Sequence, residues 1–265
     1  MPDIDLQLLA QIERSFGSDE LAQTSHWRSN GKSHIGHVRP VNEDAFLEAT
    51  EQKLWCVADG MGGLSRGDYA SKAVIKALAK FVLRPSLTES VEDLEAKLLQ
   101  VNETCRTAFR NKKLGTTVAA LLAYGDYCFY LWAGDSRIYR LRDNELVQVT
   151  DDHTVAQENR NRQAGASQND HEEEAGRPSA HVLTRAIGVH KTLRIELQFE
   201  PLEAGDRFLL CSDGLYNALP FSDIRSFLGR GSTEDALDCL VHAALEQGGQ
   251  DNITAIVVDA QAAQG

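Results

Sequence analysis

The chain has 265 residues, 42% of them hydrophobic and 25% charged, which is typical of a globular protein with a sizeable core and excludes a fibrous or disordered chain. Its formal net charge of -12 argues against a nucleic-acid-binding protein, because such proteins neutralise phosphates with clustered Lys and Arg. The chain has no run of roughly 18 apolar residues to span a membrane, no basic start of a signal peptide and no CxxC pair among its five cysteines, so we expect a soluble, cytoplasmic protein with buried free thiols.

The start of the chain differs in pattern from the remainder and predicts an N-terminal extension, residues 1–30, that forms a docked helix. Ile4, Leu8, Ile12 and Phe16 are spaced by four and would share one face of this helix. We favour packing of the helix on the chain's own domain over binding to a partner.

Beyond residue 31 the chain alternates between short apolar segments bounded by turns and segments of helical periodicity. In chain order we expect strands at 34–38, 45–49 and 53–58, helices at 70–82 and 91–109, strands at 116–124, 127–133, 137–142 and 146–149, a flap at about 150–180, strands at 193–199 and 207–211, a helix at 236–245, and a strand at 253–258. Ser90 and Asp93 have the spacing of a capping box at the start of the second helix. The flap is predicted because a polar segment of this length inside a domain is usually functional or mobile.

The order of these elements predicts an α+β fold in one domain, residues 31–260. Consecutive strands joined by short turns favour antiparallel pairing, and helices that follow in groups cover the outer faces of the sheets. We therefore expect a four-layer α-β-β-α sandwich, in which two mainly antiparallel sheets are flanked by helices.

Acidic residues stand at five junctions between strands and loops. Asp59, Asp135 and Asp213 directly follow apolar strands, whereas Glu43-Asp44 and Asp251 directly precede them. In an antiparallel sheet the end of one strand neighbours the start of the next, so these acids can gather at one edge. A single Asp-Gly pair is most simply a turn. Five acidic junctions, placed so that all can lie at one edge of the sheets, instead indicate a functional site.

The potential ligands at this edge are all oxygens, which favours Mg²⁺ or Mn²⁺ over zinc. Carboxylates gathered without cations would repel one another, and divalent ions remove that conflict. Two ions about 3.5–4 Å apart can lower the pKa of a shared water and direct it at phosphorus. The residues alone thus predict a hydrolase that uses carboxylate-bound metal.

The segments that carry the acids resemble, in order, the motifs of the metal-dependent Ser/Thr protein phosphatases (PPM, or type 2C) in their bacterial form. They are GHVRPVNED at 36–44, VADGMGG at 57–63, GTT at 115–117, GDSR at 134–137, LTRAIG at 183–188, CSDGL at 211–215 and GQDNIT at 249–254. Each segment is weakly specific by itself, whereas the ordered set is highly specific.

This resemblance implies a site in which Asp59 bridges two metal ions with the help of the Gly60 carbonyl. Asp213 and Asp251 would hold one ion, and Glu43 would hold the other largely through water, with Asp44 close by. Asp135 would bind a third, weaker ion together with Asp213. Arg39 would bind the substrate phosphate, a role that suits the paired donors of a guanidinium group. Arg39, Asp59 and Asp213 are the residues expected to carry catalysis.

The resemblance also implies direct attack of a metal-bridging hydroxide on phosphoserine and phosphothreonine of proteins, without a phospho-enzyme. Met61 departs from many eukaryotic relatives, which have a His at that position as the proposed acid for the leaving alkoxide. His153 and His181 flank the flap, and we interpret each as structural or solvent-exposed rather than catalytic. The expected partners are phosphorylated proteins and a Ser/Thr kinase that this enzyme opposes.

Two alternatives remain open at this stage. One is a catalytically silent module that binds phosphoproteins, which the retained Asp59, Asp213 and Asp251 disfavour. The other is a metal-dependent nuclease or nucleotide hydrolase. The acidic charge and the lack of a GxxxxGK[ST] motif argue against it.

Overall fold

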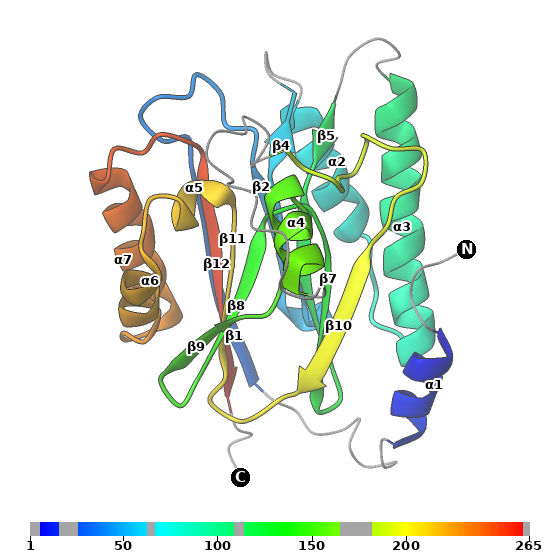
Figure 1. The fold of residues 1–265 in the computed structure, drawn as a ribbon. Coiled ribbons are helices and arrows are strands. Elements are labelled where there is room, and N and C mark those ends of the chain that lie inside the picture. Colours follow the sequence, from blue (N-terminus) through cyan, green and yellow to red (C-terminus); the bar gives the residue numbers. More distant parts are fainter. Residues whose placement is uncertain (1–5, 16–25, 63–66, 109–113, 165–181, 262–265) are drawn as a thin grey trace.

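Two five-stranded sheets stack face to face in the computed structural model, which describes residues 6–15, 26–62, 67–108, 114–164 and 182–261 (Figure 1). All strand pairs are antiparallel in these ranges. One sheet has the order β1-β12-β11-β8-β9, with β1 at His26–His34, β12 at Ile253–Gln261, β11 at Arg207–Cys211, β8 at Arg137–Arg142 and β9 at Glu145–Gln148. The other has the order β10-β7-β6-β3-β2, with β10 at Glu196–Pro201, β7 at Tyr127–Ala133, β6 at Val118–Tyr124, β3 at Leu54–Ala58 and β2 at Ala45–Ala49.

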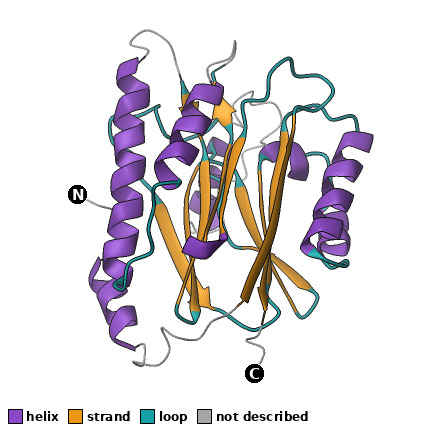
Figure 2. Ribbon diagram, turned by 180° about the vertical axis from the view of Figure 1, so that it is seen from behind, coloured by secondary structure: helices purple, strands orange, loops and turns teal. Residues whose placement is uncertain are grey.

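Helices cover the outer faces of both sheets (Figure 2). They are α1 at Leu6–Ser15, α2 at Gly67–Leu78, α3 at Leu87–Ala108, α4 at Val155–Ala164, α5 at Asp213–Tyr216, α6 at Phe221–Leu228 and α7 at Thr233–Glu246. A short ribbon of β4, Gly60–Met61, and β5, Gly115–Thr116, stands apart from the two sheets. A 3-10 turn at Thr50–Gln52 joins β2 to β3.

Three apolar clusters fill the spaces between four layers. One lies between α2, α3 and the sheet that contains β3, and includes Val74, Leu94 and Leu122. A second lies between the two sheets and includes Trp55. The third lies between α7 and the other sheet and includes Leu240. The expected α-β-β-α sandwich of the α+β class is therefore confirmed.

Several element bounds differ from those predicted. The first strand covers 26–34 instead of 34–38, so the sheet begins inside the range assigned to the extension, residues 1–30. Its sequence is polar because β1 is an edge strand that pairs only with β12 in the described chain. The predicted flap contains helix α4, and its residues 165–181, with His181, lie outside the described part of the structure.

Helix α3 begins earlier than the predicted capping box. Ser90 lies inside the helix, where its hydroxyl donates to the carbonyl oxygen of Ser86 at 2.9 Å. The local cap is Ser86, whose hydroxyl oxygen accepts from the Glu89 N–H at 3.3 Å. A second cap comes from the distant Glu13 on α1, whose carboxylate accepts from the Leu87 and Thr88 backbone N–H groups at 3.2 and 3.3 Å. Only the cap from Glu13 leaves no local sequence pattern.

Helix α1 packs against α3. Leu9 and Ile12 are buried in the same cluster as the apolar face of α3. Leu8, which was placed on the packed face, is 40% exposed. Ile4 and Phe16 lie outside the described residues. No helix in the described ranges is both long and apolar enough to cross a membrane.

Candidate active site

Strand register brings the predicted acids to one edge of the sandwich. Ala45 pairs with Ala58, so Asp44 and Asp59 extend from adjacent positions of β2 and β3. In the other sheet Cys211 pairs with both Arg137 and Ala255, which places Asp213 between the segments that carry Asp135 and Asp251. The acids that follow strands and the acids that precede strands therefore lie at the same edge, as the antiparallel pairing predicted.

Hydrogen bonds hold both the backbone N–H and the backbone carbonyl oxygen of Asp59. Its N–H donates to the Thr117 hydroxyl at 2.9 Å, and its carbonyl oxygen accepts from the Thr117 N–H and the Thr116 hydroxyl, each at 2.9 Å. The next residue, Gly60, lies so close to the neighbouring loop that a Cβ there would be 2.5 Å from the Glu43 carbonyl oxygen. Only glycine fits at this position, so the backbone from which the Asp59 side chain projects is closely packed and fixed.

Asp44 connects the two sheets at the site. The Ser212 hydroxyl donates to its Oδ2 at 2.7 Å, and the carboxylate is 7% exposed. Burial raises its pKa to about 6, with Asp213 and Asp251 adding repulsion, although hydrogen bonds from Thr254 and Ser212 act in the opposite direction. Asp44 is therefore a carboxylate that an added positive charge would stabilise.

Burial and repulsion also raise the pKa of other acids at this edge. Burial, followed by repulsion from Asp44, Asp213, Asp135 and Asp251, raises the pKa of Asp59 well above its ordinary value. Burial and repulsion from Asp213 and Asp152 raise the pKa of Asp135 to about 7. Carboxylates that oppose one another in this way, all with hard oxygen donors, fit Mg²⁺ or Mn²⁺.

Within the described ranges, no three His, Cys, Asp or Glu side chains already stand close enough together to hold an ion. The carboxylates meet other partners: Asp251 meets Arg39 at 2.6 Å, Asp44 meets the Ser212 hydroxyl at 2.7 Å, and Glu43 Oε1 meets the Gly67 N–H at 2.9 Å. Some of the acids must turn away from these partners before they can share a cation. Arg39 is 53% exposed and can move without a large loss of packing.

The comparisons with known proteins agree with this site. A family model described as protein phosphatase 2C matches residues 30–252. The chain belongs to the protein phosphatase 2C family.

Relatives and solved structures match this chain over most of its length. The serine/threonine phosphatase stp of Listeria welshimeri is 29% identical over 236 residues, which cover 84% of this chain and 92% of that one. Among solved structures, "PppA, a key regulatory component of T6SS in Pseudomonas aeruginosa" is 40% identical with a TM-score of 0.81, covering 89% of this chain and 98% of that chain. The catalytic domain of the serine/threonine protein phosphatase PstP in complex with two manganese ions is 32% identical with a TM-score of 0.77, covering 89% and 99%.

The predicted family and activity are thereby confirmed, and the chain is a metal-dependent phosphoprotein phosphatase. The predicted use of Mg²⁺ or Mn²⁺ is confirmed as a property of the family. The silent binding module is not favoured.

A buried charged network stands behind Asp135 in this protein phosphatase 2C fold. Arg137 donates from Nε and Nη2 to the two carboxylate oxygens of Asp152 at 2.8 and 2.7 Å. Its guanidinium carbon lies 3.6 Å from the centre of the Tyr216 ring, and the Tyr216 hydroxyl donates to the Asp135 carbonyl oxygen at 3.0 Å. The network fixes the backbone from which Asp135 projects.

The prediction from sequence missed three residues that support the site. Ser212 and Asn252 lie within the CSDGL and GQDNIT motifs, so the motifs themselves were the available signal. The Asn252 side chain accepts from the Glu43 N–H at 2.8 Å and donates to the carbonyl oxygens of Ile35 and Val41. Asp152 lies in the polar segment after β9, where no pattern marks it.

His153 has structural contacts at the base of the predicted flap. Its ring stacks on Trp132 with an interplanar angle of 9°. Its Nδ1 accepts from the Gly134 N–H at 3.2 Å, and its Nε2 meets Glu196 at 2.9 Å. Cys56, Cys105 and Cys211 are buried, and burial raises the pKa of each thiol, to about 11 for Cys105, so these three are unsuited to act as nucleophiles.

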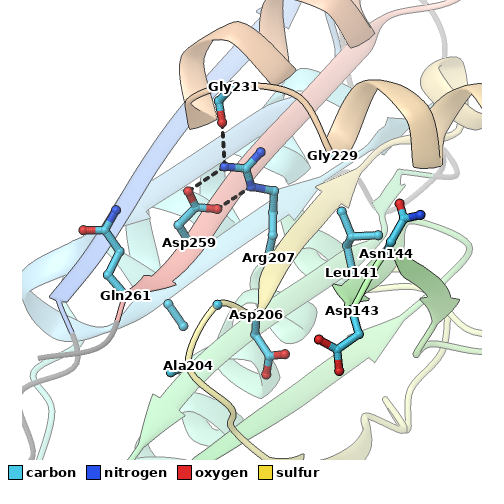
Figure 3. A pocket seen from close by; sticks show the side chains of 12 residues that line it. Leu141, Asp143, Asn144, Ala204, Asp206, Arg207, Gly229, Gly231, Asp259 and Gln261 are labelled. Carbon is cyan, nitrogen blue, oxygen red and sulfur yellow. Dashed lines mark hydrogen bonds and ion pairs between the residues drawn. The ribbon is translucent and has the colours of Figure 1, made fainter.

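A second groove lies at the far end of the strands from the acids (Figure 3). There Arg207 binds Asp259 through Nε at 2.5 Å and Nη2 at 2.8 Å, and also donates to the Gly231 carbonyl oxygen at 3.0 Å. Asp206 is paired with Arg142 at 2.6 Å. Two of the three acids that line this groove, Asp259 and Asp206, are thus paired with arginines, and Asp143 is the third.

Proposed function

We propose that the acidic edge is the active site of this phosphatase and that it acts on phosphoserine and phosphothreonine in proteins. In this proposal Glu43, Asp44, Asp59, Gly60, Asp135, Asp213 and Asp251 hold the divalent cations. The observation that carries it is the register of the strands, which brings these acids to one edge of the two sheets. There burial, with added repulsion among the carboxylates, raises the pKa of Asp59, Asp44 and Asp135. Arg39, directly beside Asp251, supplies the positive charge for the phosphate.

The chain's own residues have distinct tasks in this reaction. Bound Mg²⁺ or Mn²⁺ would supply Lewis acidity, which acidifies water and offsets charge on the phosphoryl oxygens. Thr116 and Thr117 hold the Asp59 backbone, so its side chain projects from a fixed position before any ligand binds. Positioning of this kind is the main protein contribution to phosphoryl transfer.

Arg39 binds the substrate by exchanging one anionic partner for another. Its Nη2 lies 2.6 Å from Asp251 Oδ2, and a phosphate offers the same charge with oxygens spaced for two parallel hydrogen bonds. If Asp251 were to hold a cation instead, the Arg39 guanidinium would be free to bind the phosphate. Met61 has a thioether and no proton to give, so the leaving alkoxide is protonated by another group.

The physiological partner in this proposal is a Ser/Thr kinase whose phosphorylation the enzyme reverses in the cytoplasm. The 40% identity to PppA makes type VI secretion a process to examine first. Four of the five cysteines are buried and free, which suits a reducing compartment. Deleting the gene should raise phosphoserine and phosphothreonine on a defined set of proteins, and an unchanged phosphoproteome would count against this partner.

The test of the activity is phosphate release from a phosphothreonine peptide with Mn²⁺, compared with ATP and single-stranded DNA under the same conditions. We expect release from the peptide alone. Preferential hydrolysis of ATP or DNA would favour a nucleotide hydrolase or nuclease, and binding of the peptide without release would favour the phosphoprotein-binding module.

A further inference from the structure

A tightly held turn beside the acidic edge presents an apolar side chain to solvent. The turn is 188–190 and begins with Gly188, the last residue of the LTRAIG motif. Asn102, a residue of α3 that is 3% exposed, grips both ends of this turn. Its Oδ1 accepts from the Gly188 N–H at 2.7 Å, and its Nδ2 donates to the His190 carbonyl oxygen at 3.1 Å. Val189 lies between these two hydrogen bonds and is 41% exposed.

The backbone of the turn is also restricted. Gly188 has φ +86°, and a Cβ there would lie 2.6 Å from the Leu114 carbonyl oxygen. A left-handed glycine and a buried amide thus fix one conformation. Exposed valines are common and need no explanation by themselves, but few are held out by a turn that is fixed in this way.

Val189 is continuous with the site. A Cβ on Gly115 would lie 2.8 Å from Val189 Cγ2 and 3.5 Å from Met61 Cγ, so both apolar side chains flank the same point above β5. Met61 pairs with Gly115 and follows Asp59 by two residues. Thr116, the next residue of β5, donates to the Asp59 carbonyl oxygen. We name the surface formed by Met61 and Val189, which meet over the buried Gly115, the apolar ledge.

We propose that the apolar ledge receives an apolar side chain of the protein substrate, from a residue close in sequence to the phosphorylated one. The inference rests on the proposed function, because it needs a phosphorylated polypeptide bound at the acidic edge. The ledge lies beside this position, because Met61 follows Asp59 by two residues, and a polypeptide held by its phosphate brings its neighbouring residues to the surfaces around Asp59. An apolar residue gains from burial on Met61 and Val189, which a small polar residue does not.

The test is a substrate preference. Phosphothreonine peptides carry a single Leu or a single Ser at each position from three residues before to three after the phosphothreonine. Phosphate release with Mn²⁺ gives kcat/KM for each peptide, and p-nitrophenyl phosphate serves as a substrate with no neighbouring residues. The variants are Val189→Ser, which keeps the backbone, and Val82→Ser as a matched control. Val82 is 58% exposed and follows α2 at the end away from the site.

We expect the wild-type enzyme and the Val82→Ser variant to favour Leu over Ser by about tenfold at one or two positions, as contact with a single apolar group gives. Val189→Ser should lose this preference and hydrolyse p-nitrophenyl phosphate at the wild-type rate. Absence of any preference in the wild type, or the same preference in Val189→Ser, would overturn the inference alone. Failure of the wild type to hydrolyse every substrate would overturn the proposed function with it. A changed elution volume of Val189→Ser with unchanged preference would assign the ledge to a second copy of the chain and also overturn it.

Discussion

The ion pair behind Asp135 gives a quantitative prediction. Replacing Arg137 by Met removes two hydrogen bonds to the Asp152 carboxylate, at 2.8 and 2.7 Å, and the contact with the Tyr216 ring at 3.6 Å. The two charged side chains are only 24% and 11% exposed, so the Asp152 charge would remain largely buried without its partner. Breaking such a pair costs about 3–5 kcal/mol, more than the roughly 1 kcal/mol of a surface pair.

Urea denaturation, followed by circular dichroism, measures this loss. We expect the midpoint for Arg137→Met to fall by about 1 M or more. The double variant Arg137→Met/Asp152→Leu should recover much of the stability, because no unpaired charge is left. A loss below about 1 kcal/mol in the single variant, or a double variant no more stable than the single, would refute the reasoning.

Three further predictions concern other parts of the molecule. In steady-state kinetics, Arg39→Ala should raise KM for a phosphothreonine peptide by about 10-fold or more. Arg39→Lys should raise KM less, because a lysine keeps the positive charge but cannot make two parallel hydrogen bonds to the phosphate. An unchanged KM would show that Arg39 does not bind the substrate. In urea denaturation, Gly188→Ala should lower the free energy of unfolding more than Gly205→Ala does. Both glycines have positive φ, but of the two only Gly188 has atoms within 4 Å of an added Cβ. Equal losses of stability would contradict this close approach. Glu13→Gln should lower stability by about 1 kcal/mol at pH 7, because a neutral amide oxygen accepts the helix N–H groups less strongly than a carboxylate, and a loss independent of pH would rule out the charged cap.

The pH dependence of the Glu13 effect follows from its environment. Burial alone would raise the pKa of Glu13, but hydrogen bonds from Ser86, Thr88 and Leu87 outweigh it and lower the pKa below the ordinary value of 4.5. A lowered pKa in the folded state means that the stabilisation is complete above the unfolded value. The difference between wild type and Glu13→Gln should therefore shrink as the pH falls through the folded pKa of Glu13.

The position of the acids could be predicted from sequence because it depends on strand polarity alone. Asp59 ends a strand that is buried throughout, and Ala58 can pair only with the start of a neighbouring antiparallel strand, where Asp44 stands. Strands β6 and β7 could also be predicted from their apolar sequences, because both strands are buried along almost their whole length.

Other features depend on contacts between distant residues and leave no local pattern. The polar strand β1 forms because β12 offers it a complete ladder, and Glu13 caps a helix about 75 residues away. The Arg39–Asp251 pair joins residues 212 positions apart. The four-residue helix α5 and the two-residue strands β4 and β5 are too short to show a period.

The measurement that tests the central claim most directly combines Asp59→Asn with metal binding and turnover. Isothermal titration with Mn²⁺ and phosphate release from a phosphothreonine peptide are followed for wild type and variant, with circular dichroism to establish that both are folded. We predict that wild-type release requires Mn²⁺ and stops with EDTA, and that Asp59→Asn loses both tight Mn²⁺ binding and release. Continued release by folded Asp59→Asn, or by wild type in EDTA, would contradict the assignment of this acidic edge as the catalytic metal site.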